Sequence, residues 1–334
     1  MKAVAYSIKS FEKEVLIKAN QKKHDITLIS NRLTLDTVSY AEGKDAVLVF
    51  TNDDLSAPVL RQLKKSGVKY ISTRSSGIDH IDIDEAAKLG LKVANVPSYS
   101  PESIAEHAIA LMLALCRNIL PAHHQMMEYN FTLDNLVGTT IRNKTIGIVG
   151  FGQTGQALVR ILQGFGARVL VSDLADVKEQ CITLGAAQAE YEDLLSKSDI
   201  ISFHVPLTEE TRHLVNTDSI EKMKNGVMLI NVSRGAIFNS EEVFKALQKG
   251  KISKIGMDVY EFEHGVFFYD HKEPIHDQLL KALIQNSRVL MTPHEAFLTT
   301  EALEEIAEKT IRNLDLWDTG NCVGHSPAKK LYYI

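Results

Sequence analysis

A glycine-rich turn in the middle of the chain constrains the fold more than any other feature of the sequence. Its glycines, Gly150, Gly152 and Gly155, follow the pattern G-x-G-x-x-G. The apolar run 146–149 predicts a buried parallel strand before the turn, and apolar residues at helical spacing over 156–165 predict a helix after it. In such a unit the first glycine permits a tight turn, the second lets the backbone approach a pyrophosphate, and the third lets the helix lie close to the strand. The first turn of the helix then binds the phosphates through its N–H groups and its dipole.

The strand predicted after this helix ends at an acidic residue. Residues 168–172 form the strand, and Asp173 follows it about twenty residues past the glycines, where a carboxylate hydrogen-bonds the ribose hydroxyls of a dinucleotide. A carboxylate repels the 2′-phosphate of NADP, and no arginine occurs in 174–177, so the pattern predicts NAD. The alternative is a glycine-rich turn needed only for packing. The register of strand, helix, second strand and acid favours NAD binding.

Predicted strands and helices alternate on both sides of this turn, which indicates an α/β fold with mostly parallel sheets. Before the turn the predicted strands are residues 3–8, 26–29, 46–50, 69–73 and 92–95, with helices at 12–19, 57–65 and 84–89. From the turn onward the predicted strands are residues 146–149, 168–172, 200–204, 227–231, 255–258 and 289–292, with a helix at 240–248. Six strands match a complete dinucleotide-binding sheet.

The helix predicted at 300–316 follows the second sheet and is expected to pack on the first. We therefore predict two doubly wound parallel-sheet domains, one inserted into the other. The outer one is a flavodoxin-like substrate domain of residues 1–99 and 298–334, and the inserted one is a Rossmann NAD-binding domain of residues 100–297. Two prolines, Pro97 and Pro101, suit the first crossing because they stiffen the chain. A cleft between two such domains is where a substrate would meet the cofactor.

Charge and cysteine content narrow the class of protein. A net charge of −5 over 334 residues gives no basic field for nucleic acid and no polybasic patch for a membrane. Cys116, Cys181 and Cys322 have no metal-ligand spacing, so we interpret them as free thiols in a reducing compartment and expect a soluble, cytoplasmic protein. The most apolar helix, 103–116, is too short to span a bilayer, and a buried or subunit-interface helix is expected instead. A homodimer is the default expectation, and a dimer of dimers remains open.

Three ionisable residues follow strands of the second series. Arg234 comes after strand 227–231, Glu263 after strand 255–258 and His294 after strand 289–292. Ligands bind at the carboxyl ends of parallel strands, so these side chains are expected at one edge of the sheet. An arginine binds a carboxylate in bidentate fashion and polarises a carbonyl, a histidine exchanges protons near neutral pH, and a carboxylate orients the histidine. The alternative is that all three are surface charges on loops.

No metal is predicted. The segment with His264, Asp270, His271 and His276 is rich in possible ligands, but its spacing fits no usual zinc pattern. His123, its neighbour His124, and His204 are interpreted as surface or packing residues, and lining of the cofactor cleft by His204 remains open.

The sequence around these residues resembles the D-isomer-specific 2-hydroxyacid dehydrogenase family over nearly its whole length. The most similar blocks are residues 99–107, 146–155, 201–208, 223–226, 231–235, 256–261 and 292–297. The Ser-Arg-Gly and Pro-His blocks are specific to that family. The segment that continues through 265–268 is similar to the lactate branch and less similar to the phosphoglycerate and formate branches.

The resemblance implies a reversible hydride transfer between NADH and a small 2-keto acid, pyruvate in the lactate branch, to give the D-2-hydroxy acid. It implies that Arg234 binds the substrate, that His294 is the acid/base and that Glu263 supports the histidine. Glu261 is the competing carboxylate, and Glu263 is preferred. Two other functions remain open: reduction of a bulkier 2-keto acid such as phenylpyruvate or 2-ketoisocaproate, depending on the pocket near Leu298, and an NADH-sensing corepressor.

The resemblance also implies contacts for substrate and cofactor. On the substrate side it implies that the backbone N–H groups of Ser76 and Gly77 bind the carboxylate. It also implies that Tyr99 lines the pocket and that Phe297 shields the substrate methyl group from water. On the cofactor side it implies contacts to the pyrophosphate from Gln153 and Thr154, to the adenosine from Val205, Pro206 and Thr211, and to the nicotinamide from Val232, Ser233 and Asp258. The sequence departs from the family at Val232, where many members have Cys or Thr, and at Glu295.

Overall fold

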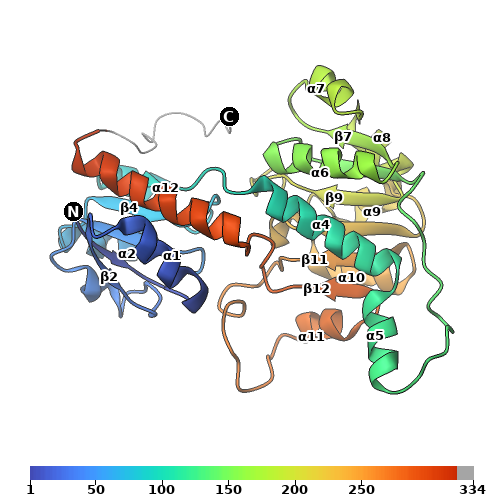
Figure 1. Ribbon diagram of the computed structural model, residues 1–334, viewed down its shortest axis with the longest axis horizontal. Helices are drawn as coiled ribbons and strands as arrows, with labels where there is room; N and C mark the ends of the chain where they lie inside the picture. Colours follow the sequence, from blue (N-terminus) through green and yellow to red (C-terminus); the bar gives the residue numbers. More distant parts are fainter. Residues whose placement is uncertain (322–334) are drawn as a thin grey trace. The chain divides into compact units, whose positions relative to one another are not determined.

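The computed structural model describes residues 1–321, which divide into two compact units (Figure 1). Unit 2 comprises Pro101–Ala296, and unit 1 comprises Met1–Ser100 together with the segment that begins at Phe297. Each crossing differs by one residue from the predicted one, so that Ser100 and Phe297 belong to unit 1 rather than to the inserted domain. Cys322, predicted to be a free thiol, lies outside the described residues.

Unit 1 contains a five-stranded parallel sheet in the order β2-β1-β3-β4-β5, which is the flavodoxin-like order. Its strands are β1 (Lys2–Ala5), β2 (Asp25–Leu28), β3 (Ala46–Val49), β4 (Tyr70–Thr73) and β5 (Lys92–Ala94). Both faces of the sheet are apolar: along β3, Val47 and Val49 pack on one face and Ala46 and Leu48 on the other. Burial on both faces is what parallel sheets require.

Helices cover both faces of this sheet. On one side lie α2 (Ala57–Lys65) and α3 (Ile83–Lys88), with the short 3₁₀ helix η1 (Val38–Ala41) nearby. On the other side α1 (Ser10–Asn20) packs against α12 (Thr300–Asp318), so the two ends of the sequence meet in one layer (Figure 1). Trp317 of α12 stacks on Tyr70 with ring centroids 4.8 Å apart. The last helix therefore packs on the first sheet, as the sequence predicts.

Unit 2 contains a seven-stranded parallel sheet in the order β12-β11-β10-β9-β6-β7-β8. Its strands are β6 (Thr145–Val149), β7 (Arg168–Ser172), β8 (Ala187–Gln188), β9 (Ile200–Phe203), β10 (Val227–Asn231), β11 (Ile252–Met257) and β12 (Val289–Met291). The prediction of six strands was therefore wrong by one. The missed strand, β8, has only two residues, too few to show a periodic pattern.

Two helical layers enclose the second sheet. On one face lie α4 (Pro101–Cys116), α6 (Gln153–Gly164) and α7 (Lys178–Thr183), and Figure 1 shows α4 and α6 side by side across that face. On the other face lie α8 (Tyr191–Lys197), α9 (Thr217–Lys222), α10 (Ser240–Gln248) and α11 (Gln278–Gln285), with the short 3₁₀ helix η2 (Gly235–Ile237). The remaining helix, α5 (Ile119–Met127), buries no residue.

Most of the apolar side chains of α4 are buried in the core of unit 2, so the helix is chiefly a packing element. Within residues 1–321 no single helix has the length and apolar composition to cross a membrane. Taken together, α4 and α5 meet that requirement by length and composition alone, with a 60° bend between them.

Candidate active site

The glycine turn follows β6, and the surrounding backbone leaves no room for a side chain at two of its three glycines. Gly150 has φ +96°, and a Cβ there would lie 2.7 Å from the carbonyl oxygen of His204. A Cβ on Gly155 would lie 2.3 Å from the carbonyl oxygen of Gly150. Gly152 differs, because a Cβ there would meet no atom of the described residues within 4 Å. Packing within unit 2 therefore does not require a glycine at this middle position, and its open surface suits the close approach of a phosphate group.

The helix after the turn begins earlier than the sequence predicts. Gly152 is the N-cap of α6, and the helix starts at Gln153, three residues before the predicted start. The first-turn N–H groups of a helix can bind phosphate. In α6 this first turn contains Gln153 and Thr154, the two residues expected at the pyrophosphate. The turn and the helix together fit a dinucleotide phosphate.

Asp173 is held against the glycine turn. Its Oδ2 accepts a hydrogen bond from the backbone N–H of Phe151 at 2.7 Å, and its Oδ1 accepts one from the N–H of Ala175 at 3.0 Å. These two bonds fix the carboxylate directly after β7. The side chain is half-buried, and each oxygen keeps a second lone pair that can accept a ribose hydroxyl.

The loop after β9 carries the residues expected near the adenosine. Thr211 closes this loop, because its hydroxyl donates to the carbonyl of Pro206 at 2.6 Å and accepts from the N–H of Thr208 at 2.8 Å. Val205 and Pro206 follow His204 directly. Burial lowers the pKa of His204 from its usual 6.5 to about 4, so this imidazole is neutral at physiological pH. Its Nε2 lies 2.8 Å from the hydroxyl of Ser202.

Arg234 belongs to a turn that is fixed from inside by the side chain of Asn231. The buried Asn231 amide donates to the carbonyl of Arg234 at 2.9 Å, and its Oδ1 accepts from both the N–H and the hydroxyl of Ser233. Val232 is buried between them. Asn231 was not singled out from the sequence, although an asparagine at the end of a strand is a common turn signal. It orients the segment that carries the guanidinium.

His294 and Glu263 form a direct pair. Nδ1 of His294 lies 2.6 Å from Oε1 of Glu263, and both side chains are largely buried. A carboxylate can only accept when ionised, so the proton on Nδ1 points to Glu263 and Nε2 is left as the nitrogen that can exchange a proton. Phe268 packs beside the imidazole, with ring centroids 5.7 Å apart. This geometry is that of an oriented acid/base.

The second oxygen of Glu263 is also used. It accepts the backbone N–H of Tyr260 at 2.8 Å, so the carboxylate is oriented by its own turn. Glu261, the competing carboxylate, has a different partner, because its Oε1 lies 2.5 Å from Nε2 of His213. The hydrogen bond from the Tyr260 N–H could not be predicted from the sequence, because any residue other than proline would supply the same backbone donor.

Asp258 holds the backbone on which His294 lies. Its fully buried carboxylate accepts the N–H groups of Glu295 and Ala296, both at 2.8 Å, and the hydroxyl of Thr292 at 2.6 Å. Its carbonyl accepts the N–H of His294 at 2.7 Å. His294 has φ +58°, a left-handed conformation that is uncommon for a side chain of this kind and is kept here by these bonds. Asp258, which is expected near the nicotinamide, therefore also holds the backbone of residues 294–296 in place.

In unit 1, Ser76 and Gly77 lie in a tight turn after β4. The carbonyl of Ser76 accepts the amide of Asn95 at 2.7 Å, and the carbonyl of Gly77 accepts the hydroxyl of Ser75 at 2.8 Å. These two bonds fix the turn, in which the backbone N–H groups are the donors suited to an anion. The hydroxyl of Ser76 donates to Pro97 at 3.3 Å.

Aromatic rings gather in the same unit around Phe297. Its ring centroid lies 6.3 Å from that of Tyr99, 6.5 Å from that of Phe11 and 6.1 Å from that of Phe50. Phe297 is 7% exposed. Phe11 and Phe50 were not singled out from the sequence, since an aromatic residue next to a strand or helix is usually core.

A buried ion pair supports this region. Arg74, 1% exposed, donates from Nε to Oε2 of Glu12 at 2.9 Å and from Nη2 to the carbonyl of Tyr6 at 2.8 Å. Its guanidinium lies 5.7 Å from the ring centroid of Phe50. The pair joins α1 to the residue just before the Ser75–Ser76 turn and was not predicted.

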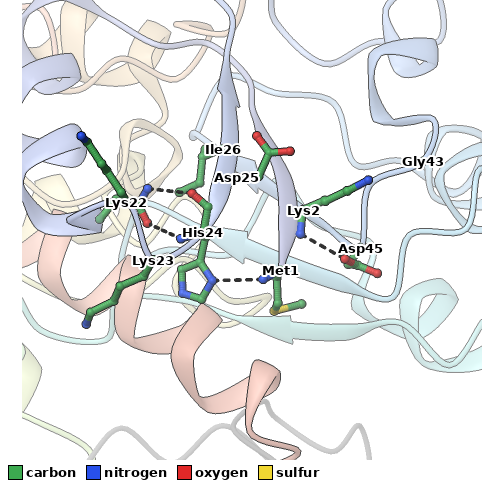
Figure 2. Close-up of a pocket in the computed structure, with 10 residues that line it drawn as sticks. Met1, Lys2, Lys22, Lys23, His24, Asp25, Ile26, Gly43 and Asp45 are labelled. Carbon is green, nitrogen blue, oxygen red and sulfur yellow. Dashed lines mark hydrogen bonds between the residues drawn. The ribbon is translucent and has the colours of Figure 1, made fainter.

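A cavity of about 890 Å³ in unit 1 contains none of the predicted site residues. Figure 2 shows its lining, with the Met1 amino group bonded to His24 and the Lys2 N–H bonded to Asp45. Lys2 and Asp25 begin β1 and β2. The cavity therefore lies at the amino ends of the strands, opposite the edge at which parallel sheets bind ligands.

No cluster of three or more His, Cys, Asp or Glu side chains within residues 1–321 is arranged to hold a metal ion. In the histidine-rich segment after β11, Nε2 of His271 lies 2.7 Å from the carbonyl oxygen of Val266, a contact within the loop.

Comparison with known proteins agrees with this geometry. Residues 109–296 match the family model for the NAD-binding domain of D-isomer specific 2-hydroxyacid dehydrogenases. The chain is 44% identical to the D-lactate dehydrogenase of Escherichia coli (strain K12) over 96% of its own length and 98% of that protein. The solved structure of the pyruvate reductase of Chlamydomonas reinhardtii is 40% identical, with a TM-score of 0.90 over 97% of this chain and 98% of that one. The D-lactate dehydrogenase of Aquifex aeolicus, solved with NAD and lactic acid, is 30% identical with a TM-score of 0.86 over 96% of each chain.

Proposed function

Because the chain belongs to the D-isomer specific 2-hydroxyacid dehydrogenase family, whose members are NAD-dependent oxidoreductases, we propose that it reduces pyruvate to D-lactate with NADH and catalyses the reverse reaction. The observation that carries this proposal is the 2.6 Å contact between Nδ1 of His294 and Glu263, on the same sheet edge as Arg234. A histidine oriented by a carboxylate beside an arginine suits a substrate that has both a carboxylate and a carbonyl.

Each polar residue has a defined role in this proposal. Arg234 binds the substrate carboxylate and stabilises the negative charge that develops on the carbonyl oxygen. His294, protonated, gives the proton on Nε2 to that oxygen. Glu263 keeps the imidazole oriented and stabilises its charged form. When bound, NADH supplies the hydride that the 2-keto carbon accepts.

The contacts in unit 1 are part of the proposal. The N–H groups of Ser76 and Gly77 bind the substrate carboxylate, Tyr99 lines the pocket, and Phe297 shields the methyl group of the substrate from water. The bonded carbonyls of the Ser76 turn and the close packing of rings around Phe297 support these roles. A crowded aromatic cluster also favours a small substrate such as pyruvate over a bulkier 2-keto acid.

The cofactor contacts are proposed on the same basis. We assign unit 2 as the NAD-binding domain and unit 1 as the substrate domain. The pyrophosphate is expected at Gln153 and Thr154, the ribose at Asp173 and the adenosine beside Val205, Pro206 and Thr211. The nicotinamide is expected near Val232, Ser233 and Asp258. The open surface at Gly152 and the fixed carboxylate of Asp173 support these assignments.

We also propose a cytoplasmic homodimer, or a dimer of such dimers. Cys116 and Cys181 are buried free thiols, which suits a reducing compartment. The apolar surface that a partner subunit can cover lies on α5 and the segment after it, where seven large side chains are more than half exposed: Ile119, Met126, Met127, Tyr129, Phe131, Leu133 and Val137.

Steady-state kinetics on three substrates tests the proposed function. The oxidation of NADH is followed at 340 nm with pyruvate, 2-ketoisocaproate and phenylpyruvate, and the product is analysed for its D isomer. We expect kcat/KM to be highest with pyruvate. A preference for a bulky 2-keto acid would keep the mechanism and change the substrate. Tight binding of NADH without turnover of any of the three would instead indicate a corepressor.

A further inference from the structure

A second carboxylate–histidine pair lies in the same loop system as the first. Nε2 of His213 lies 2.5 Å from Oε1 of Glu261, whose side chain is 11% exposed. The other oxygen of Glu261 accepts the backbone N–H of Ser240, the first residue of α10, at 3.0 Å. A carboxylate at the start of a helix is stabilised by the positive end of the helix dipole. Glu261 is thus anchored through both of its oxygens.

Glu261 lies inside the turn that orients Glu263. The N–H of Glu263 donates to the carbonyl of Tyr260 at 3.2 Å, and the N–H of Tyr260 donates to Oε2 of Glu263 at 2.8 Å. These reciprocal bonds close the turn 260–263 and direct the remaining oxygen, Oε1, at His294. A movement of Glu261 would move the peptide on which Glu263 depends.

The same turn is held from its other side by a glycine. A Cβ on Gly235 would lie 2.0 Å from the carbonyl carbon of Tyr260 and 2.4 Å from the nitrogen of Glu261. The two backbones are therefore in direct contact, without side chains between them. The turn is clamped between the backbone of Gly235 and the side chain of His213.

His213 itself is well fixed. Its N–H donates to the carbonyl of Ala236 at 2.8 Å, and its own carbonyl accepts the amide of Asn216 at 3.0 Å. Its backbone has φ +52°. It lies two residues after Thr211, so the pair joins the loop expected at the adenosine to the turn that carries Glu263.

We propose that Glu261 is a positioning residue for the reaction: bonded to His213 and to the N–H of Ser240, it fixes the turn 260–263 so that Glu263 faces His294. This inference rests on the proposed function, because it assigns Glu261 a part in orienting the acid/base. In this role Glu261 acts only through Glu263.

Two variants test this role without disturbing the backbone. Glu261→Gln keeps the size of the side chain and removes its charge, and His213→Asn removes the imidazole while asparagine tolerates the positive φ at that position. We expect kcat for pyruvate to fall about 10- to 100-fold in each, the size of effect that a small misplacement of a reacting group produces. The Kd for NADH, measured by fluorescence titration, should stay within about twofold. Glu241→Gln is the matched control, because Glu241 is an exposed residue of α10 paired with Lys245, and it should leave kcat unchanged.

The decisive measurement is a double-mutant cycle with Glu263→Gln. If Glu261 acts through Glu263, adding Glu261→Gln to Glu263→Gln lowers kcat no further, and His213→Asn behaves in the same way. Multiplicative losses would overturn the inference and show a general structural role, as would wild-type kcat in both single variants. His294→Gln distinguishes a failure of the proposed function from a failure of the role proposed for Glu261. If it retains full kcat, the proposed function fails, whereas an inactive His294→Gln beside a fully active Glu261→Gln removes only this inference.

Discussion

At the scale of single residues, two carboxylates two positions apart have separate histidine partners. Glu263 bonds His294, and Glu261 bonds His213. The difference matters because Glu263 contacts the proposed acid/base directly, whereas Glu261 is proposed to act on it through the turn that carries Glu263. His294 keeps an uncommon backbone conformation because Asp258 accepts its N–H and the N–H groups of the two residues that follow it. In the proposed reaction, these fixed neighbours pre-organise His294 for proton transfer.

Arg234 is predicted to act in both substrate binding and the transition state. Replacing it by glutamine removes a charge-assisted bidentate contact, so KM for pyruvate should rise while kcat falls. We expect kcat/KM to decrease by about a hundredfold or more, since a hydrogen bond to a charged group contributes about 1.5–3 kcal/mol. Steady-state kinetics of Arg234→Gln measures this directly. An unchanged kcat/KM would remove Arg234 from the site.

Asp173 is predicted to set the preference for NADH over NADPH. Alanine at this position removes both the acceptor for the ribose hydroxyls and the charge that repels a 2′-phosphate. The ratio of kcat/KM values for the two cofactors should therefore fall by about tenfold or more, through weaker use of NADH and better use of NADPH. The comparison needs both cofactors at saturating pyruvate. A ratio equal to that of the wild type would show that another residue binds the ribose hydroxyls.

His204 gives a prediction about stability and pH. Its pKa is about 4 in the folded protein and 6.5 for an unperturbed histidine, so the unfolded chain binds the proton more tightly. The stabilising contribution is complete above pH 6.5 and is lost as the pH falls toward 4, with a slope of up to about 1.4 kcal/mol per pH unit. Urea unfolding of His204→Asn should show a shallower decline in the free energy of unfolding over this range. Equal slopes for the variant and the wild type would contradict a neutral His204 imidazole in the folded protein.

At the scale of elements, the strength of the local pattern decided which predictions were right. Apolar runs located the long strands, and α2 and α10 begin and end where the sequence predicts. The two-residue strand β8 has no pattern to detect. The start of α6 was placed three residues late because glycine, glutamine and threonine near Gly152 carry no apolar signal, while tertiary packing of the glycine turn extends the helix.

The segment of α5 and the residues after it carries a prediction about assembly. Leu133 is 80% exposed, and covering a side chain of this kind contributes about 1.5–3 kcal/mol. Leu133→Glu would place a charge in such an interface, so we expect a shift from dimer to monomer in sedimentation experiments at micromolar concentration. Leu174→Glu is the control, since Leu174 is a fully exposed leucine in a different loop. A monomeric wild type, or an unchanged dimer in Leu133→Glu, would place the interface elsewhere or remove it.

At the scale of the whole molecule, the alternation of strands and helices predicted both parallel sheets, and the structure confirms two α/β units. The candidate site was harder to predict from the sequence than the fold. Ionisable residues at the ends of strands could be found by rule, but Asn231, Tyr260 and the Arg74–Glu12 pair act through backbone contacts or buried charge between distant segments. Such contacts depend on the folded arrangement of several loops and leave no local periodicity.

The central claim is that this chain transfers a hydride from NADH to the keto carbon of pyruvate and yields the D isomer. The most direct test uses NADH that carries deuterium at the transferred position of C4, incubated with pyruvate and the wild-type protein. We predict D-lactate with one deuterium on C2, identified by mass spectrometry after separation on a chiral column. L-lactate as the product, or D-lactate without the label, would contradict it.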